Sequence, residues 1–534
     1  MKPTRIVVFL PIIIAFALAI GIYLGKKLAS PNTTLVFNNS EFNEEDKLQQ
    51  VLNYIKSDYV DTVKEQFIVE ETINEMLQNL DPHSYYIPKR RFSQMNDPLE
   101  GNFEGIGVEF RIQEDTVVVV QPVGGGPSEK LGIRAGDRIV TVEKELIAGI
   151  GINNSDVIKK LKGPKGTIVN VGIKRRGRND LIDFSITRDE IPFYSIEAKY
   201  MLDDKTAYIK VIRFARTTYD EFMAAVEELK QAGMQKLILD LRNNSGGYMK
   251  SAIDMCDEFL PKGKMIVYTE GKAREKREYY ATSRGELENT QVAVLINEGS
   301  ASASEILAGA LQDNDLGAII GRRSFGKGLV QEGIQWPDGS GIRLTVARYY
   351  TPTGRSIQKP YEKGLEAYNN EAFERYESGE LLSLDSLDLP DSLKYYTEKG
   401  KLLYGGGGIL PDYFVPIDTT SVSVYFGKLN YQGMFYQFGF QYVDEHRGEL
   451  KNSYNERSYV SNYTINGAVL KAFYDFVEES GIPYDEAGAD SSEWIIKNRL
   501  KATIGRNIWG NGVFYQVINE EDKVVDKAKD LFRL

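Results

Sequence analysis

Apolar residues in the middle of the chain follow two spacings, one typical of buried strands and one typical of amphipathic helices. Short apolar runs at 236–241 and 291–297 predict strands, and the stretches 218–233 and 249–260 carry apolar residues at helical intervals. Strands that alternate with helices in this way favour an α/β layer. We therefore expect an α/β core over residues 191–417.

The parts of the chain on either side of this core show different patterns. Residues 42–100 keep helical spacing with a break near Asp61, which predicts an N-terminal helical segment. Residues 101–190 alternate short apolar strands with glycine turns, and residues 418–534 return to helical spacing after an aromatic run. The pattern thus predicts a β domain before the core and a mostly helical C-terminal domain after it.

One segment within the core range lacks the pattern of apolar strands and helices. Residues 361–403 are rich in Glu, Asp, Ser and Leu. A run of charges of this kind is typical of a solvated surface. We expect an acidic, partly helical surface insertion there, with its charges in water.

A long apolar run lies near the N-terminus. Residues 6–24 contain no charged residue, and basic residues flank them on both sides. Such a run is long enough to cross a bilayer, and the sequence after it is a poor context for signal-peptide cleavage. We therefore interpret residues 1–27 as an uncleaved membrane anchor, and residues 28–41, rich in Asn, Thr and Ser, as a tether. Positive charge on both flanks leaves the orientation of the anchor open.

Composition narrows the classes of function without choosing one. A chain of 534 residues with 42% hydrophobic residues is long enough for about three or four globular domains. The net charge of −11 argues against a nucleic-acid partner, which would need a basic face. Cys256 is the only cysteine, so no intramolecular disulfide can form.

A candidate nucleophile follows the apolar run 291–297. Small residues lead from this run into a helical pattern, and Ser302 is followed by Glu305 at the spacing of a capping box. The hydroxyl of Ser302 is therefore expected at the helix N-terminus, beside unpaired N–H groups that suit an oxyanion. From the residues alone, the alternative is that Ser302 only caps the helix.

A candidate base lies in the sequence GRRSFGKGLVQ, where Lys327 stands between two glycines. The two histidines, His83 and His446, are not near a motif of this kind, so a serine nucleophile would need a neutral lysine as its base. That requires lowering the lysine pKa by about three units from roughly 10.4. Gln331 can orient the amine without adding a negative charge. In isolation, Lys327 could equally be a surface-loop lysine and Gln331 a polar strand residue.

Four motifs occur along the chain: DLRNNSGG at 240–247, NEGSASASEI at 297–306, FGKGLVQ at 325–331 and YYTPTGRSIQ at 349–358. Together they resemble the C-terminal processing peptidases, also called tail-specific proteases, over most of residues 45–415. The resemblance implies a ClpP/crotonase-like α/β spiral for the core. It also implies that Ser302 is the nucleophile, Lys327 the general base and Gln331 the residue that positions the lysine.

The NNSGG turn ends a predicted buried strand, as the serine turn does. Its glycine amides are therefore expected to face the same pocket. We place one oxyanion donor at the backbone of Gly246 or Gly247 and the other at Ala303. Asp240 and Arg242, in the same motif, are expected to fix the loop and not to take part in the chemistry.

Two segments within residues 101–190, EGIGVEF and GGGPSEKLGIRAGDRIVTV, resemble a PDZ domain. In such a domain, backbone N–H groups of a loop hold a chain-terminal carboxylate, and the strand after the loop accepts a peptide as an added strand. The resemblance places this loop at Gly105, Ile106, Gly107 and Val108. An ordinary hairpin turn is the alternative interpretation of a G-x-G sequence on its own.

The resemblance also bears on the N-terminal part of the chain. The LDPHSYYIP sequence resembles the end of the family's N-terminal helical segment, which in relatives helps dimerisation or shapes the entrance to the site. Self-association into a homo-oligomer therefore stays open. The resemblance further implies a catalytic body on the periplasmic side of the inner membrane, attached through residues 6–24. Within this sequence, His83 is interpreted as a packed turn residue, not as a catalytic or metal-binding group.

The sequence as a whole predicts a multidomain α/β serine endopeptidase that captures C-terminal tails of protein or peptide substrates with a PDZ domain and cleaves them with a Ser/Lys dyad. No metal or organic cofactor is implied. Two alternatives are a non-catalytic, membrane-anchored PDZ protein that binds peptides, and acyl-CoA chemistry on a crotonase-like fold. The intact serine, lysine and glutamine argue against the first, and the PDZ signature argues against the second.

Overall fold

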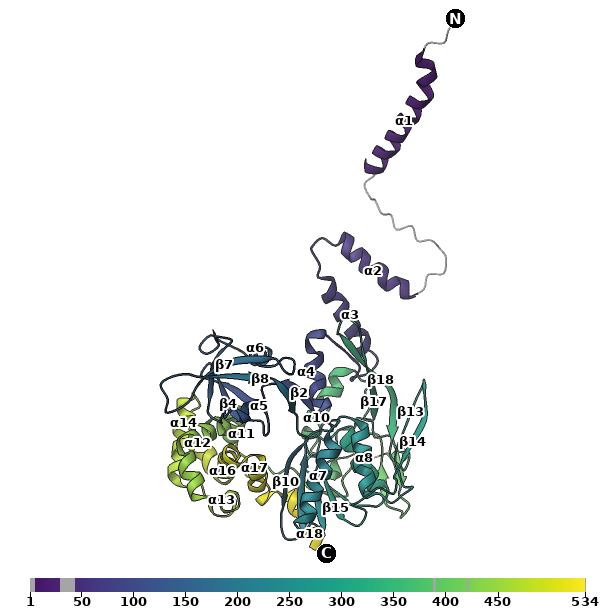
Figure 1. Ribbon diagram of the computed structural model, residues 1–534. Coiled ribbons are helices and arrows are strands. Elements are labelled where there is room, and N and C mark those ends of the chain that lie inside the picture. Colours follow the sequence, from purple (N-terminus) through teal and green to yellow (C-terminus); the bar gives the residue numbers. More distant parts are fainter. Residues whose placement is uncertain (1–4, 29–43, 388–389, 420–421, 534) are drawn as a thin grey trace. The chain divides into compact units, whose positions relative to one another are not determined.

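The computed structural model describes residues 5–28, 44–387, 390–419 and 422–533 (Figure 1). The chain divides into two compact units, residues 1–72 and residues 73–534. The second unit contains the predicted β domain, the α/β core and the C-terminal helices.

The first unit is helical. It contains α1 (Arg5–Leu28), α2 (Glu44–Asp58) and the beginning of α3 (Glu65–Gln78). The break predicted near Asp61 separates α2 from α3, and an exposed ion pair joins Lys56 Nζ to Glu65 Oε2 at 2.6 Å across it. Within the described residues, no helix has the length and apolar character needed to cross a membrane. The predicted tether lies almost wholly outside the described residues.

A six-stranded sheet forms the middle of the second unit, in the order β10-β11-β12-β15-β16-β21. Its strands are β10 (Ile196–Met201), β11 (Thr206–Val211), β12 (Lys236–Asp240), β15 (Gln291–Ile296), β16 (Ala318–Gly321) and β21 (Tyr413–Phe414). β10 is antiparallel to β11, and the other neighbours are parallel. Parallel neighbours need crossover connections between them. The predicted α/β core is therefore confirmed.

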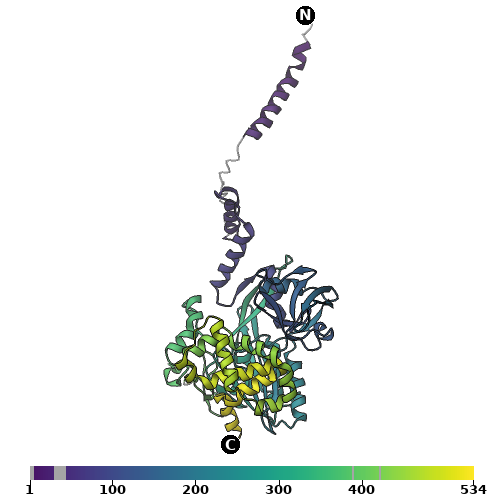
Figure 2. The same ribbon diagram turned by 90° about the vertical axis from the view of Figure 1, so that its left-hand side faces the viewer.

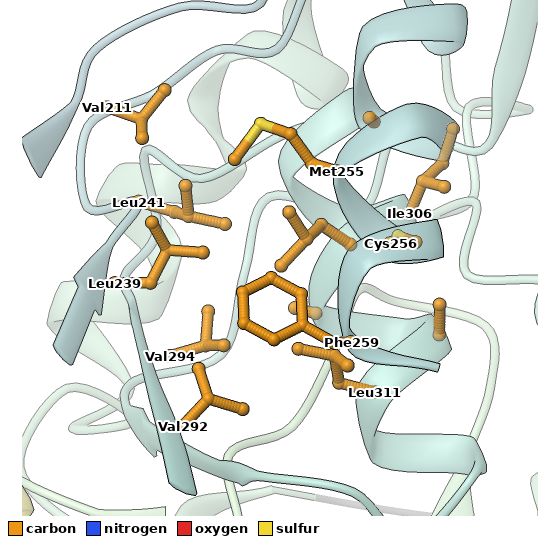
Figure 3. Close-up of a cluster of buried hydrophobic side chains, with 14 of the residues drawn as sticks. Val211, Leu239, Leu241, Met255, Cys256, Phe259, Val292, Val294, Ile306 and Leu311 are labelled. Atoms are coloured by element: carbon orange, nitrogen blue, oxygen red, sulfur yellow. The ribbon is translucent and has the colours of Figure 1, made fainter. Parts of the chain in front are cut away.

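Helices α7 (Thr218–Gln231), α8 (Met249–Phe259) and α9 (Ala303–Asp313) follow strands of this sheet. Figure 3 shows Leu239 and Val294 of the sheet beside Phe259 of α8, within one buried apolar cluster. Cys256 of α8 belongs to the same cluster and has no exposed surface. Every residue of α9 is buried, so this helix lies in the interior of the second unit.

A second sheet lies beside the core and carries the predicted base region. It contains β1 (Tyr85–Ile87), β13 (Met265–Gly271), β14 (Arg274–Tyr280), β17 (Leu329–Gln335) and β18 (Gly341–Tyr350). β1 and β17 both pair with β18. The LDPHSYYIP sequence thereby comes next to Gln331, although about 250 residues separate them in the chain.

The β domain has its own sheet and core. Its elements are β3 (Val108–Gln113), β4 (Thr116–Pro122), α5 (Pro127–Lys130), β5 (Arg138–Val142), β6 (Glu145–Leu146), α6 (Asn154–Leu161), β7 (Ile168–Lys174) and β8 (Ile182–Thr187). The ribbon of β2 (Asn102–Gly105) and β9 (Asp189–Pro192) brings the two ends of the domain together after α4 (Lys89–Glu100). The domain therefore enters and leaves the core at one place.

The acidic segment is partly helical, as predicted, but part of its charge is buried. It contains α10 (Leu365–Glu377), two short 3-10 helices (Leu384–Ser386 and Asp391–Leu393), β19 (Lys394–Tyr396) and β20 (Leu402–Tyr404). Glu380 is 5% exposed and pairs with Arg323 at 2.6 Å, and Arg375 Nη1 donates to Ser324 O at 2.9 Å. The prediction of a solvated face is wrong for these side chains, because the loop before Lys327 supplies their buried partners.

The C-terminal part is helical, as predicted. It consists of α11 (Val424–Tyr431), α12 (Met434–Ser453), α13 (Glu456–Asn462), α14 (Gly467–Glu479), α15 (Glu486–Ser491), α16 (Glu493–Trp509), α17 (Asn511–Ile518), a 3-10 turn (Asn519–Glu521) and α18 (Lys523–Arg533). Capping side chains begin several of these helices. Asn466, for example, accepts a hydrogen bond from Val469 N at the start of α14.

These helices contact both the β domain and the core. Arg111 Nη1 of β3 donates to Tyr436 O at 3.2 Å, and its guanidinium lies over the ring of Phe440. α18 places Val525 and Ala528 in a cluster with core-strand residues such as Ile238. Figures 1 and 2 both show the yellow-green C-terminal helices beside the blue β domain. The C-terminal helices therefore connect the β domain to the core sheet.

Candidate active site

Ser302 stands at the junction of β15, a tight turn and α9. It is the N-cap of α9, with φ of 55° and ψ of −111°, a backbone conformation that residues with a Cβ rarely adopt. Holding such a conformation costs about 1 to 3 kcal/mol, which the surrounding contacts must supply. Ser302 and Glu305 form the capping box, but Ser302 Oγ donates no hydrogen bond to a described residue, so its proton remains available at the mouth of the helix.

The two neighbouring serines have structural partners instead. Ser300 Oγ is buried and donates to Leu241 O at 2.9 Å. Ser304 Oγ is also buried and donates to Asn244 O at 2.9 Å. Both bonds tie the serine turn to the loop after β12. Of the three serines in this motif, only Ser302 keeps a hydroxyl proton that is not donated to a described residue.

Lys327 lies in the loop before β17, with its amine largely removed from water. Nζ donates to Gln331 Oε1 at 2.8 Å. Burial, together with the positive charge of Arg343, lowers the pKa of Lys327 to about 8, whereas Asp81 and Glu305 act in the opposite direction. No hydrogen bond joins Nζ to Ser302 Oγ among the described residues. The amine is therefore partly neutral near pH 8.

Glu305 joins the serine turn to the lysine loop. Its Oε2 accepts from Ser302 N at 2.7 Å and from Lys327 N at 2.9 Å, so both backbones meet at one oxygen. Its Oε1 accepts from Ser324 Oγ at 2.5 Å and from Gly326 N at 2.7 Å. Burial raises the pKa of Glu305 to about 7, although these four donors favour the carboxylate. The capping-box pattern predicted only one of the four bonds.

Tyr349 forms a second bridge between the two backbones. Its hydroxyl donates to Ser302 O at 3.1 Å and also to Lys327 O. Tyr349 is the buried first residue of the YYTPTGRSIQ motif. The YYTPTGRSIQ motif therefore contributes to the site through Tyr349, whose hydroxyl ties the serine turn to the lysine loop.

Gln331 is oriented by the LDPHSYYIP segment. Its Nε2 donates to His83 O, which directs Oε1 towards the lysine. The ring of His83 packs against Tyr368, with Nε2 2.8 Å from the tyrosine hydroxyl. Burial and the nearby Lys327 lower the pKa of His83 to about 4, so this ring is neutral at neutral pH. His83 is a packed residue, as predicted, but its carbonyl belongs to the site.

The glycine loop after β12 approaches the serine closely. A Cβ on Gly246 would lie 2.8 Å from Ser302 Cβ and 2.8 Å from Ala303 N, so only glycine fits there. The amide of Gly246 donates to Asn244 Oδ1 at 2.9 Å and is thus already occupied. In the described structure, the amides of Gly247 and Ala303 have no partner. Of the two predicted glycine donors, Gly247 is therefore the one that is free.

Asp240 and Arg242 hold this loop, as predicted. Arg242 Nη2 pairs with Asp240 Oδ2 at 2.6 Å, and Lys210 Nζ pairs with Asp240 Oδ1 at 3.0 Å. Burial alone would raise the pKa of Asp240, but these two cations hold it well below its usual range. Arg242 Nη1 also pairs with Asp522 Oδ2 of the C-terminal region at 2.7 Å. The loop is thus fixed from both sides.

The predicted carboxylate loop is formed at the edge of the β domain. Ile106 O accepts from Ser128 Oγ at 2.6 Å, and Gly107 O accepts from Val123 N at 2.9 Å. Within the described residues, the amides of Ile106 and Gly107 have no partner. Gly107 has φ of 71°, and a Cβ there would lie 2.9 Å from Ile191 Cδ1. The loop lines a cavity of about 960 Å³.

The hydroxyl of Ser302 is available, and Glu305 and Tyr349 tie its backbone to that of Lys327, whose amine is partly neutral. Acyl transfer needs a nucleophile and a base of these kinds. The free amides beside Ser302 meet the need of the oxyanion. Fold and site together therefore define the class of serine-type hydrolases.

Comparison with known proteins agrees with this class. The profile of peptidase family S41 matches residues 205–366, that of a PDZ domain matches 105–186, and that of a family of unknown function, DUF8443, matches 425–510. The carboxy-terminal-processing protease of Bartonella bacilliformis is 35% identical over 63% of this chain and 78% of its own length. The carboxy-terminal processing protease CtpB of Bacillus subtilis is 33% identical over 65% and 73%.

The solved structures include a photosystem II D1 C-terminal processing protease, 31% identical over 59% of this chain and 84% of that chain, with a TM-score of 0.34. The coverage and identity of the curated relatives decide the family: this chain belongs to the carboxy-terminal processing proteases of peptidase family S41. It is a serine protease with a PDZ domain. The predicted family resemblance is confirmed.

Proposed function

We propose that Ser302 and Lys327 form a catalytic dyad that cleaves peptide bonds. The observation that carries this proposal is the buried amine of Lys327, with a pKa of about 8 and a neutral amide as its partner. A neutral amine has two N–H groups and one lone pair. One N–H can stay on Gln331 Oε1 while the lone pair accepts the proton of Ser302 Oγ.

The steps follow from this proton transfer. Ser302 Oγ attacks the carbonyl carbon as Lys327 Nζ takes its proton, and the oxyanion accepts hydrogen bonds from the amides of Gly247 and Ala303. The C–N bond then breaks, and the lysine gives its proton to the leaving amine. A water molecule then attacks the acyl carbon as Lys327 takes its proton, the bond from that carbon to Ser302 Oγ breaks, and the lysine returns the proton to Oγ, which releases the acid and restores the serine.

Gln331 serves as the positioning residue in this scheme. Its neutral carbonyl holds the amine without stabilising the ammonium form as strongly as a carboxylate would. His83 O in turn fixes the amide so that its oxygen, and not its nitrogen, faces the lysine.

The PDZ domain is proposed to capture the substrate by its C-terminus. The free amides of Ile106 and Gly107, continuing to Val108, are suited to a terminal carboxylate, and β3 is suited to receive an extended chain as an added strand. A peptide-bound PDZ domain of a carboxy-terminal protease from Vibrio cholerae is 29% identical over 17% of this chain. The expected substrates are proteins and peptides with free C-termini.

Three further parts of the proposal rest on the sequence. The uncharged run at residues 6–24 supports attachment to the inner membrane, with the catalytic body on the periplasmic side. The helical spacing before the PDZ domain leaves self-association open. Alternating strands and helices of the core fit a ClpP/crotonase-like spiral.

The test is cleavage of an unfolded protein with a free C-terminus, followed by mass spectrometry. Ser302→Ala should abolish cleavage and keep the melting temperature within a few degrees, because the serine hydroxyl donates no bond to a described residue and losing its cap contact costs only about 1 kcal/mol. Activity that persists in this variant would place the nucleophile elsewhere. Ser480→Ala is the matched control, because Ser480 is an exposed serine of the C-terminal helices whose hydroxyl bonds to Phe476 O, and this variant should keep full activity.

A further inference from the structure

The cavity at the PDZ loop extends beyond the PDZ domain. Its lining includes the loop, β3 and α6 of that domain, but also Phe193 and Arg213 of the core and Arg506 and Asn511 of the C-terminal helices. Three parts of the chain thus build one groove. A peptide held by its carboxylate at the loop would meet surfaces that an isolated PDZ domain does not have.

The charged side chains that line this groove form ion pairs or hydrogen bonds with other described residues, with one exception. Lys162 pairs with Asp97 at 2.8 Å, Arg506 pairs with Glu109 at 3.5 Å, and Glu197 accepts from the Tyr515 hydroxyl at 2.6 Å. Arg213 is the exception. Its guanidinium forms no ion pair and no hydrogen bond with any described residue, although it lines the same cavity.

The surroundings of Arg213 favour an anionic partner. The side chain is half-buried, with its guanidinium 5.4 Å from the centre of the Phe193 ring. Burial lowers the pKa of Arg213, whereas Glu197 and Glu221 act in the opposite direction from beyond ion-pair distance. A cation that is partly removed from water without a hydrogen-bond acceptor is costly to bury. A carboxylate entering the groove would supply that acceptor.

The backbone that carries Arg213 is well fixed. The next residue, Phe214, donates its amide to Gly246 O at 2.9 Å and accepts from Tyr248 N at 2.7 Å. Through these two bonds, Phe214 pairs with the glycine loop of the active site. The backbone from which the Arg213 side chain extends is therefore held in place beside the cavity.

We propose that Arg213 recognises an acidic side chain of the substrate, upstream of the terminal carboxylate. A tail added as a strand to β3 places its residues about 3.3 Å apart, so residues before the terminus pass along the groove. A Glu or Asp there can make a bidentate pair with the guanidinium, which Gln or Lys cannot. The preferred substrate class is thus a free C-terminus preceded, within the length of the groove, by an acidic residue. This inference rests on the proposed carboxylate capture by the PDZ loop.

The test uses the full chain with Ser302→Ala, so that peptides bind without being cleaved. Fluorescent peptides with one apolar tail carry Glu at each upstream position in turn, and each is compared with its Gln and Lys counterparts by anisotropy. At one position Glu should improve the Kd about tenfold, as expected for one additional charge-assisted pair. Arg213→Gln should remove the preference, and Arg213→Glu should reverse it in favour of Lys at the same position.

Arg178→Gln is the control for the change in net charge, because Arg178 is an exposed residue outside this cavity. It should leave the Glu preference unchanged, and the melting temperature of each variant reports on folding. Amidated peptides separate the two proposals. If free tails bind better than amidated ones but Glu and Gln bind equally at every position, the acidic subsite is wrong and the PDZ proposal stands. If amidation has no effect, both are wrong.

Discussion

The active site and the PDZ loop differ in how firmly their backbones are held. Around Ser302 and Lys327, one buried carboxylate accepts four hydrogen bonds and a buried tyrosine hydroxyl bridges two carbonyls. At the PDZ loop, the carbonyls of Ile106 and Gly107 are bonded, their amides have no partner among the described residues, and the loop lines a cavity. The serine turn and the lysine loop are tied together before substrate arrives, and in the described structure only the amides of Gly247 and Ala303 are free beside Ser302, whereas the PDZ loop has no comparable bridge there and gains its bonds from a ligand.

This difference separates chemistry from capture. A fixed site avoids reorganisation when charge develops in the transition state. An open loop gains its hydrogen bonds only on binding, so its contribution should appear in substrate affinity. Changes in the first region should therefore act on kcat, and changes in the second on KM.

The largest effect is expected from the lysine. Lys327→Arg should lower kcat by about a thousandfold or more, because a guanidinium stays protonated and cannot accept the serine proton. In the unchanged protein, the rate should rise with pH through an ionisation near the Lys327 pKa of about 8, since only the neutral amine acts as base. Cleavage of one unfolded substrate across a pH series measures both.

Lys250→Arg is the control for this experiment, because Lys250 is an exposed residue with an ion pair to Asp254 on α8. It should keep the full rate. An Lys327→Arg variant that retained a substantial rate would show that the lysine acts through its charge, and the dyad mechanism would be abandoned.

The next largest effect is expected from Glu305→Gln. An amide has one acceptor oxygen where the carboxylate has two, so its NH₂ group would face donors that now bond to Glu305. Displacement of the lysine loop by about 1 Å can cost about a hundredfold in kcat. Steady-state kinetics should show that loss with KM nearly unchanged. Glu332→Gln, which breaks an exposed pair with Arg274, is the control and should have no effect.

A smaller effect is expected from Gln331→Ala. This change removes the acceptor of the Lys327 amine but keeps the amine itself. We expect a fall in kcat of about tenfold, because orientation is lost and the base is not. A loss as large as that of Lys327→Arg, measured on the same substrate, would contradict a role limited to positioning.

The smallest effect is expected at the capture loop. Amidating the substrate C-terminus removes the carboxylate proposed to bind Ile106 and Gly107, which should raise KM severalfold, by about 1 kcal/mol of binding free energy, and leave kcat unchanged. Steady-state kinetics on paired free and amidated peptides measures the difference. A change confined to kcat would contradict the division between the two regions.

Local patterns in the sequence predicted the elements of the core and the family motifs predicted the candidate site. Apolar spacing located β12, β15, α7 and α8 within one or two residues, because these segments are buried on regular faces. The strand–turn–helix around Ser302 was readable for the same reason. Periodicity cannot, however, show which elements meet in space.

The hydrogen bonds that hold the site together join elements that meet only in the folded protein, so periodicity could not predict them. Glu305 accepts from Ser324, Gly326 and Lys327, and these contacts form only after β16 and β17 place the loop beside α9. The bond from Gln331 to His83 O joins segments far apart in the chain. A spacing of three residues between Ser302 and Glu305 suggested a helix cap and nothing more.

The prediction that the acidic segment has only solvated charges was wrong for the same reason, because composition does not show which residues meet in the folded protein. Its composition resembles a solvated surface, but Glu371 and Glu380 face Arg323 and Arg375 of the folded protein. The partners lie on the lysine loop and on α10, so charge composition alone could not show that Glu380 is buried and Glu371 half-buried.

The position of Cys256 makes the protein convenient for labelling. This residue is the only thiol of the chain, and burial raises its pKa far above the usual value, so that neither access nor thiolate formation favours reaction with alkylating reagents. A cysteine introduced on an exposed strand or helix would then be the single reactive thiol. Spectroscopic probes could be attached to the PDZ domain or the C-terminal helices without first removing a native residue, and movement between them could be followed while a tail binds.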